Sequence, residues 1–144
     1  MTLPELEALA RSGRLKREVA TQAEFDGLVR SGLTRLKDAQ GSTLAIESRF
    51  DLAYNASHSL ALAALRWHGF RSESRYIVFQ VLPHTLGLEP GVWRVFDKAH
   101  SVRNVSEYEG YSRLDPRLVE DLLVAAKTLQ AAVLKLGPVE QATN

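Results

Sequence analysis

The side chains best suited to chemistry in this chain lie within residues 100–111. In a helix with about 3.6 residues per turn, one face of this segment carries polar side chains: His100, Arg103, Asn104, Glu107, Tyr108 and Tyr111. The opposite face would carry the apolar side chains Val95, Val102 and Val105. A guanidinium group binds phosphate through paired hydrogen bonds, and an imidazole can transfer protons. We therefore take the polar face as the candidate site. An ordinary solvated face with an Arg–Glu pair is the alternative.

The evidence for any other reactive or ligand-binding site is weaker. No two of the four histidines have the spacing that clamps a metal ion from one helix, so we expect no metal site; they are His58, His68, His84 and His100. The absence of cysteine excludes disulfides and thiolate metal sites. No glycine-rich phosphate loop follows a strand, and we expect no cofactor.

Two further polar features leave alternatives open. A basic cluster precedes the second helix and could contact phosphates or be a solvated connector; it comprises Arg11, Arg14, Lys16 and Arg17. Asn55 lies in a mostly apolar segment, where an unpartnered amide is costly. It could orient the polar face from a neighbouring helix, or it could donate a hydrogen bond to a backbone carbonyl.

The overall composition predicts one globular domain over residues 1–144, with an N-terminal extension at 1–20 and a frayed tail at 138–144. The chain has 45% hydrophobic and 24% charged residues and a formal net charge of +1. No net field therefore indicates nucleic acid or a membrane surface. No apolar run approaches the roughly 20 residues of a membrane span, and the N-terminus lacks the basic start of a signal peptide. We expect a cytoplasmic protein.

Helical periodicity dominates the first half of the chain. Thr2 with Glu5 and Thr21 with Glu24 form capping-box patterns that predict helix starts. The longest helix should begin at Ser42 or Thr43 and end at Gly69. Within it Ser57 can be buried by donating to a carbonyl one turn back.

The second half of the chain continues this pattern. Residues 76–82 form an apolar run, which we predict to be a buried helix starting at Ser72 or Ser74, since a lone strand would leave its backbone groups unpaired. Pro90 should open the helix that carries the polar face, and Asp115 followed by Pro116 should open the last one. That last helix should bury one face, which contains Leu118, Leu122, Ala125, Leu129, Val133 and Leu136. The predicted fold is an all-α, up-and-down bundle of about five helices.

The segment Arg103–Tyr108 resembles the motif of the HEPN superfamily of helical nucleotide-binding domains. In that superfamily an arginine is followed by a polar residue and, a few residues later, by a histidine. Arg103 matches the arginine and Asn104 the polar residue, whereas Tyr108 stands in the place of the histidine. The resemblance in layout extends from about Thr21 to Leu136, and it implies a dimeric helical bundle.

The resemblance implies two functions for a toxin–antitoxin or defence-associated protein. In the first, the chain binds RNA or nucleotide phosphate and is a metal-independent endoribonuclease. Arg103 would stabilise the charge on the phosphate, and His100 or Tyr108 would transfer the proton. Tyrosine is the poorer base of the two, because its ordinary pKa is near 10. Asn104, Glu107 and Tyr111 would then contact the ligand. In the second, the same face is a noncatalytic dimeric module that pairs with a nucleotidyltransferase or an antitoxin. By analogy with adenylylated relatives, Tyr108 or Tyr111 would be an acceptor of modification.

Overall fold

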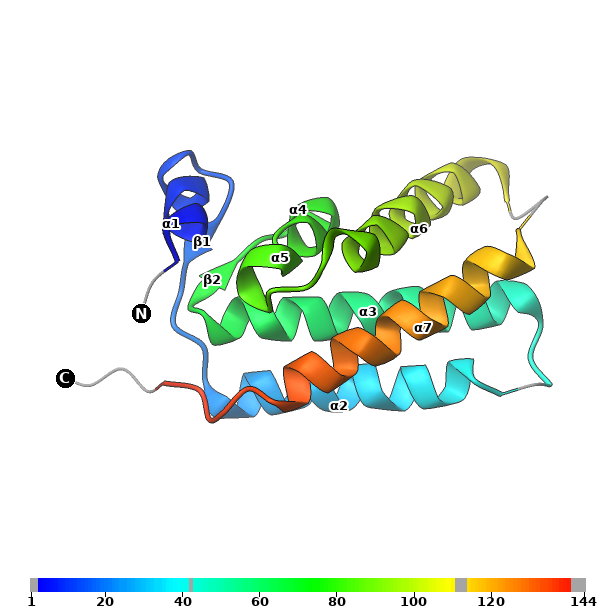
Figure 1. The fold of residues 1–144 in the computed structure, drawn as a ribbon, viewed down its shortest axis with the longest axis horizontal. Coiled ribbons are helices and arrows are strands. Elements are labelled where there is room, and N and C mark those ends of the chain that lie inside the picture. Colours follow the sequence, from blue (N-terminus) through cyan, green and yellow to red (C-terminus); the bar gives the residue numbers. More distant parts are fainter. Residues whose placement is uncertain (1–2, 42, 111–113, 141–144) are drawn as a thin grey trace.

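The computed structural model describes residues 3–41, 43–110 and 114–140, apart from the side chains of Glu107 and Tyr108. This part of the chain forms an all-α bundle, as the sequence predicts (Figure 1). The elements are α1 (Pro4–Arg11), β1 (Lys16–Arg17), α2 (Gln22–Ala39), α3 (Ile46–Trp67), β2 (Phe70–Arg71), α4 (Arg75–Gln80), α5 (Leu82–Thr85), α6 (Pro90–Glu109) and α7 (Pro116–Leu134).

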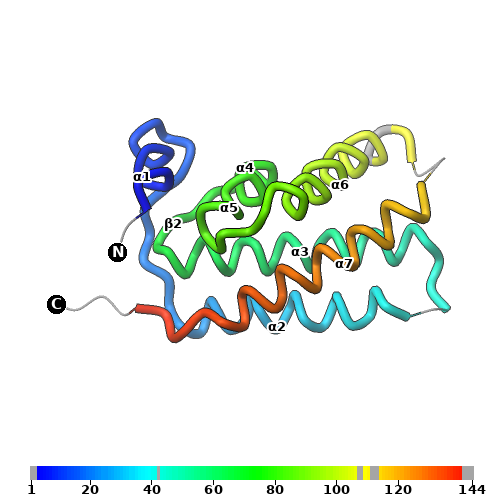
Figure 2. Tube along the Cα trace, viewed as in Figure 1, coloured from blue at the N-terminus to red at the C-terminus, as the bar shows by residue number. Residues whose placement is uncertain are grey.

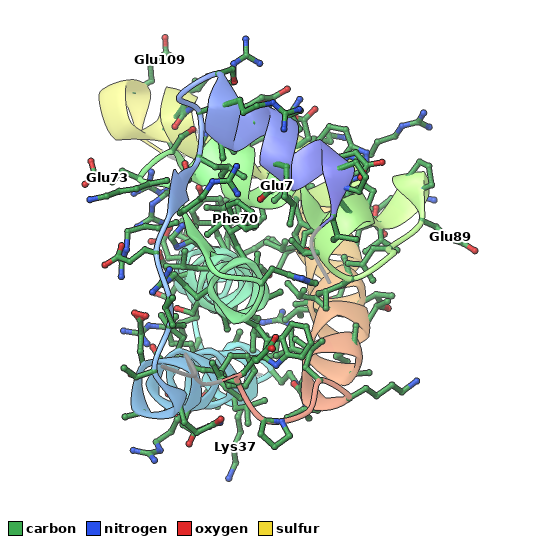
Figure 3. All side chains as sticks on the ribbon, turned by 90° about the vertical axis from the view of Figure 1, so that its left-hand side faces the viewer. Glu7, Lys37, Phe70, Glu73, Glu89 and Glu109 are labelled. Carbon is green, nitrogen blue, oxygen red and sulfur yellow. The ribbon has the colours of Figure 1, made fainter. Side chains whose placement is uncertain are left out.

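Helix α3 is the central element of the bundle. It packs against α2, α4, α6 and α7, and α7 also contacts α6. The trace in Figure 2 shows α3 running back along α2, with α4, α5 and α6 on the other side of α3. Helix α7 crosses α3 diagonally and ends beside α2. Figure 3 looks along α3 and shows α2 below it, α7 on one side of it and the α4–α6 layer above it.

The composition of α3 explains why it can be covered on most sides. Its buried residues include Phe50, Leu60 and several alanines between positions 53 and 64. The small side chains of these alanines let neighbouring helices come close. Ser57 is buried and its hydroxyl donates to the carbonyl of Ala53 at 2.8 Å, as predicted. Helix α2 comes close to α3 at Gly32, where a Cβ atom would lie 2.6 Å from Leu60 Cγ.

Three helix starts follow the local signals in the sequence. Thr21 accepts a hydrogen bond from the Glu24 amide at 3.1 Å at the start of α2. The Ser74 hydroxyl accepts from the Ile77 amide at 3.3 Å at the start of α4, and Asp115 caps α7. Each side chain satisfies an amide that has no partner within its own helix.

Two helices begin later than their capping signals predict. Helix α1 begins at Pro4 with Leu3 in the capping position and no side-chain cap, and Thr2 of the predicted Thr2–Glu5 pattern lies outside the described residues. A proline in the first turn needs no capping partner for its own nitrogen. Helix α3 begins at Ile46, after both Ser42 and Thr43, and it too lacks a side-chain cap.

The apolar run 76–82 is helical and largely buried, as predicted, but it is divided between two helices. Helix α4 ends at Gln80 and α5 starts at Leu82, with Pro83 in its first turn. Proline cannot donate the backbone hydrogen bond that would continue α4. Val78, Phe79 and Leu82 are buried on both sides of this break.

The sequence did not predict the small sheet that joins the N-terminal segment to the bundle. Strands β1 and β2 pair in antiparallel fashion, with Lys16 opposite Arg71 and Arg17 opposite Phe70. Leu6, Leu15 and Ala20 are buried, so the described part of the segment 1–20 contributes to the core.

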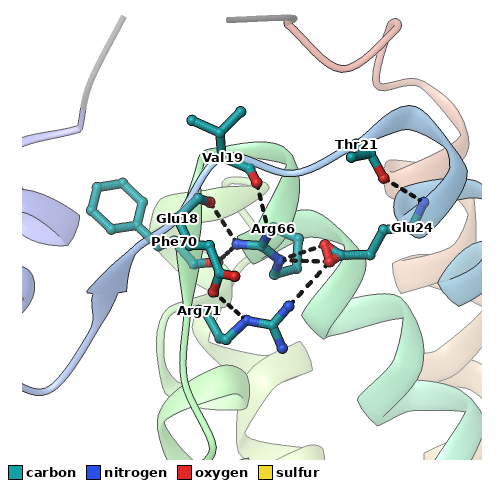
Figure 4. A network of polar contacts seen from close by, with 7 residues as sticks. All are labelled: Glu18, Val19, Thr21, Glu24, Arg66, Phe70 and Arg71. Atoms are coloured by element: carbon teal, nitrogen blue, oxygen red, sulfur yellow. Dashed lines mark hydrogen bonds and ion pairs between the residues drawn. The ribbon is translucent and has the colours of Figure 1, made fainter.

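Arg66 anchors the chain between β1 and α2. Its side chain is 2% exposed, and its guanidinium donates to the carbonyls of Glu18, Val19 and Phe70 and to the carboxylate of Glu24 at 2.9 Å (Figure 4). Arg71 donates hydrogen bonds to the carboxylates of Glu18 and Glu24. Its bond to Glu18 lowers the pKa of the Glu18 carboxyl. Because the guanidinium of Arg66 already bonds three carbonyls and a carboxylate, its role is to hold the fold together rather than to bind a ligand.

One prediction about the C-terminal tail is wrong. Val139 is buried, and its amide donates to the side chain of Gln22 at 2.7 Å, so residues 138–140 are not frayed. Residues 141–144 lie outside the described part of the chain.

Candidate functional site

The candidate site is centred on Tyr54 of α3. Tyr54 is 1% exposed, and its ring packs against Phe50 and Phe79. Its hydroxyl oxygen lies 2.9 Å from His100 Nδ1 of α6. A buried tyrosine hydroxyl needs a polar partner. The Tyr54–His100 hydrogen bond therefore fixes the side of α6 that faces α3.

His100 makes a second hydrogen bond within α6. Its Nε2 lies 3.2 Å from the amide nitrogen Nδ2 of Asn104. An amide nitrogen can only donate, so Nε2 accepts this bond and the neutral imidazole carries its proton on Nδ1, which donates to Tyr54. Tyr54, His100 and Asn104 form a chain of hydrogen bonds from the core to the surface.

Two arginines from different helices lie against the same tyrosine ring. The Cζ atom of Arg103, in α6, is 5.2 Å from the centre of the Tyr54 ring, and that of Arg75, in α4, is 5.6 Å away. At these distances a guanidinium is attracted by the negative face of the ring. Arg75 Nη1 also donates to Asn55 Oδ1 at 3.1 Å.

His58 of α3 lies at the edge of this group. Its ring meets the ring of Phe79 edge-on at 6.0 Å. Burial lowers the pKa of His58 from 6.5 to about 4, with further lowering from Arg75, Arg103 and His100. A charge in a partly buried position beside cationic groups is unfavourable. His58 is therefore neutral at pH 7, and the positive charge of the site belongs to its arginines.

The structure brings together three of the predicted site residues: His100, Arg103 and Asn104. The side chains of Glu107 and Tyr108, and all of Tyr111, lie outside the described residues.

The predicted burial of the opposite face of α6 is only partly correct. Val95 and Val102 pack against the core, whereas Val105 is 56% exposed. The hydrogen bond between His100 and the Tyr54 hydroxyl places this part of the polar face against α3, and Val105 then lies on a side of α6 that is directed away from the core.

The structure resolves one of the two features left open by the sequence, and the role of the basic cluster stays a prediction. Asn55 donates to the carbonyl of Asp51 at 2.8 Å, and its amide oxygen accepts from Arg75 of α4. It thus bonds a backbone carbonyl and positions a site residue that the sequence analysis had not included. In the basic cluster at 11–17, Arg17 forms an ion pair with Glu7. Elements α1 and β1 lie at the end of the bundle remote from the C-terminal end of α6 (Figure 1).

Sequence reasoning missed Tyr54, Arg75 and Tyr76. Tyr76 is 40% exposed, and its ring lies 6.0 Å from the ring of His100. The one feature of the sequence that could have pointed to Arg75 and Tyr76 is their position directly after the predicted cap Ser74. No local signal shows that this pair faces α6, because that depends on how α4 crosses the bundle.

Comparison with family models, with curated proteins and with solved structures finds no match for this chain. Among the described residues, no group of three His, Cys, Asp or Glu side chains is placed to hold a metal ion. In the same part of the chain, no helix combines the length and apolar character needed to cross a bilayer.

Proposed function

We propose that this chain is a HEPN-like protein of the toxin–antitoxin or defence type that binds RNA or nucleotide phosphate at the α3–α4–α6 site. The observation that supports the proposal best is Arg103, which lies over the Tyr54 ring one helical turn from His100. A guanidinium held by an aromatic ring is oriented before it meets an anion, so less conformational freedom is lost on binding.

The proposed reaction is metal-independent cleavage of RNA. The ribose 2′-oxygen attacks the adjacent phosphorus, the bond to the leaving 5′-oxygen breaks, and one proton passes from the 2′-hydroxyl to that oxygen. Arg103 would stabilise the charge on the phosphate oxygens. His100 or Tyr108 would transfer the proton, and Asn104 would orient His100 or the phosphate.

A second candidate is the noncatalytic dimeric module. The hydrogen bonds of His100 favour it, because both ring nitrogens are already engaged, with Tyr54 and with Asn104. His100 must give up one of these bonds to act as a base. In this alternative the α6 face pairs with a second copy, or with a nucleotidyltransferase or antitoxin, since arginine and tyrosine are enriched at such interfaces.

Cleavage of a single-stranded RNA panel in the presence of a metal chelator separates the two candidates. We expect wild-type protein to cleave, and Arg103→Ala to lower the rate about 100-fold or more, the usual loss when one group that stabilises the developing charge is removed. Arg94→Ala is the matched control. Arg94 is exposed on the same helix and lies nine residues earlier, about half a turn away around the axis.

Tyr108→His sharpens this test by introducing the histidine of the motif. We expect it to raise cleavage if the remaining site is competent. If neither wild type nor Tyr108→His cleaves RNA, and Arg103→Ala weakens a partner complex instead, the module is the correct alternative. Unchanged cleavage, ligand binding and assembly in Arg103→Ala would show that the site assignment is wrong.

A further inference from the structure

We infer that α4 supplies half of the ligand site: Arg75 contacts a second phosphate and Tyr76 stacks on a base, so the ligand is a single-stranded RNA segment rather than a mononucleotide. This inference rests on the proposed function. It adds two residues that lie outside the motif in α6 and assigns each a different part of the ligand.

Arg75 is placed to contact the same strand as Arg103. Both guanidinium carbons lie within 6 Å of the Tyr54 ring centre, so the two cations converge from α4 and α6 on one side chain of α3. Burial lowers the pKa of His58, and both arginines lower it further, as expected for cations on the same side of α3. Two guanidinium groups, one from each helix, can each contact a phosphate of one strand.

The bonding of Arg75 differs from that of several other arginines in the fold. Arg17, Arg49, Arg66 and Arg71 each lie within ion-pair distance of a carboxylate. Within the described residues, Arg75 has no carboxylate partner, and its single hydrogen bond goes to the neutral amide of Asn55. A guanidinium has five N–H donors. Arg75 therefore keeps donors and an uncompensated charge for an anionic ligand.

Tyr76 provides an apolar surface beside this pair of arginines. It is among the large apolar side chains of the chain that stay exposed, and its ring is tilted by 43° against the ring of His100. Exposed aromatic rings in a cationic groove bind single strands because every base offers a face for stacking. The neighbouring residues Arg75 and Tyr76 thus pair a phosphate contact with a base contact.

The test is binding of a fluorescein-labelled 2′-O-methyl oligoribonucleotide, which lacks the attacking hydroxyl and is not cleaved. Anisotropy titrations at several salt concentrations give the affinity and its salt dependence. We expect Arg75→Ala and Arg103→Ala each to lower the slope of log K against log salt by about 0.7, the value for one phosphate contact on a single strand. Tyr76→Ala should weaken binding about fivefold or more and leave the slope unchanged.

Four controls keep the result interpretable. Arg75→Lys retains the charge and should retain the slope, and Arg94→Ala should behave as wild type in both affinity and slope. Helical circular dichroism and thermal midpoints establish that each variant is folded at the titration temperature. Adenosine monophosphate, as an unlabelled competitor, should displace the oligonucleotide only at a much higher concentration than an unlabelled strand.

The failures of the two proposals are distinguishable. If Arg103→Ala loses affinity while Arg75→Ala and Tyr76→Ala bind as wild type, the α4 subsite is wrong and the proposed function stands. If the mononucleotide competes as well as the strand, the RNA assignment is wrong. If wild-type protein does not bind the oligonucleotide, or Arg103→Ala binds it unchanged, both proposals fail.

Discussion

His58 makes the stability of the fold depend on pH. Its pKa is lowered from 6.5 to about 4 in the folded chain, so between these values the unfolded chain binds a proton that the folded chain does not. The resulting stabilisation is fully present above pH 6.5 and is lost as the pH falls toward 4. The effect is at most about 3 kcal/mol, and partial exposure of the ring reduces it.

The expected result is that His58→Gln loses less stability than wild type between pH 7 and pH 4.5. Urea denaturation at both pH values measures this, because the carboxylates that also titrate in this range are common to both proteins and cancel in the comparison. His84→Gln changes an exposed histidine and should keep the wild-type pH dependence. Equal losses in wild type and His58→Gln would mean that His58 is protonated in the folded protein at pH 4.5.

Only part of the candidate site was predictable from the sequence. His100, Arg103 and Asn104 share one helical face, and the period of the helix is a local property. Tyr54 and Arg75 reach them from α3 and α4, where the meeting point depends on the packing of three helices. Tyr54 is buried in the core, but its sequence pattern does not reveal that its hydroxyl bonds His100, because an aromatic ring in an apolar stripe has the same pattern with or without such a partner.

At the scale of elements, the contact between α2 and α3 depends on one glycine. A Cβ atom at Gly32 would lie 2.6 Å from Leu60 Cγ and 3.2 Å from the carbonyl oxygen of Ala56. Gly32→Ala should therefore force the helices apart and destabilise the protein by about 1–3 kcal/mol, despite the better helix propensity of alanine.

Gly27 of the same helix provides the matched control. A Cβ atom there meets nothing within 4 Å, so Gly27→Ala should stabilise the protein by about 1 kcal/mol through helix propensity alone. Urea midpoints at a constant slope measure both changes. If the two variants shift in the same direction, the close approach of α2 to α3 at Gly32 does not determine the stability.

The helix boundaries show which signals a sequence can reveal. The starts at Thr21, Ser74 and Asp115 were predictable because a capping side chain bonds an amide two or three residues away. The pairing of β1 with β2 was not, since it joins residues far apart in sequence and each strand has only two residues. Such a short strand carries no period that could be recognised.

At the scale of the whole molecule, the bundle leaves the C-terminal half of α6 incompletely covered. Helix α6 buries Phe96 and Ala99 in its first half, but none of the residues 100–106 is fully buried. The central helix α3, by contrast, is covered by its own chain. We therefore expect a surface for a second copy on α6, where an apolar side chain, Val105, is exposed next to Asn104.

We expect the chain to form a homodimer through this half of α6. Sedimentation equilibrium at tens of micromolar should give about twice the chain mass of 16.0 kDa. Val105→Asp should return the mass to that of one chain, because it places a charge in an apolar contact. Val124→Asp introduces the same charge at a 65% exposed valine of α7 and should leave the dimer intact. A wild-type mass of 16.0 kDa would exclude the dimer, and dissociation by both variants would exclude α6 as its specific interface.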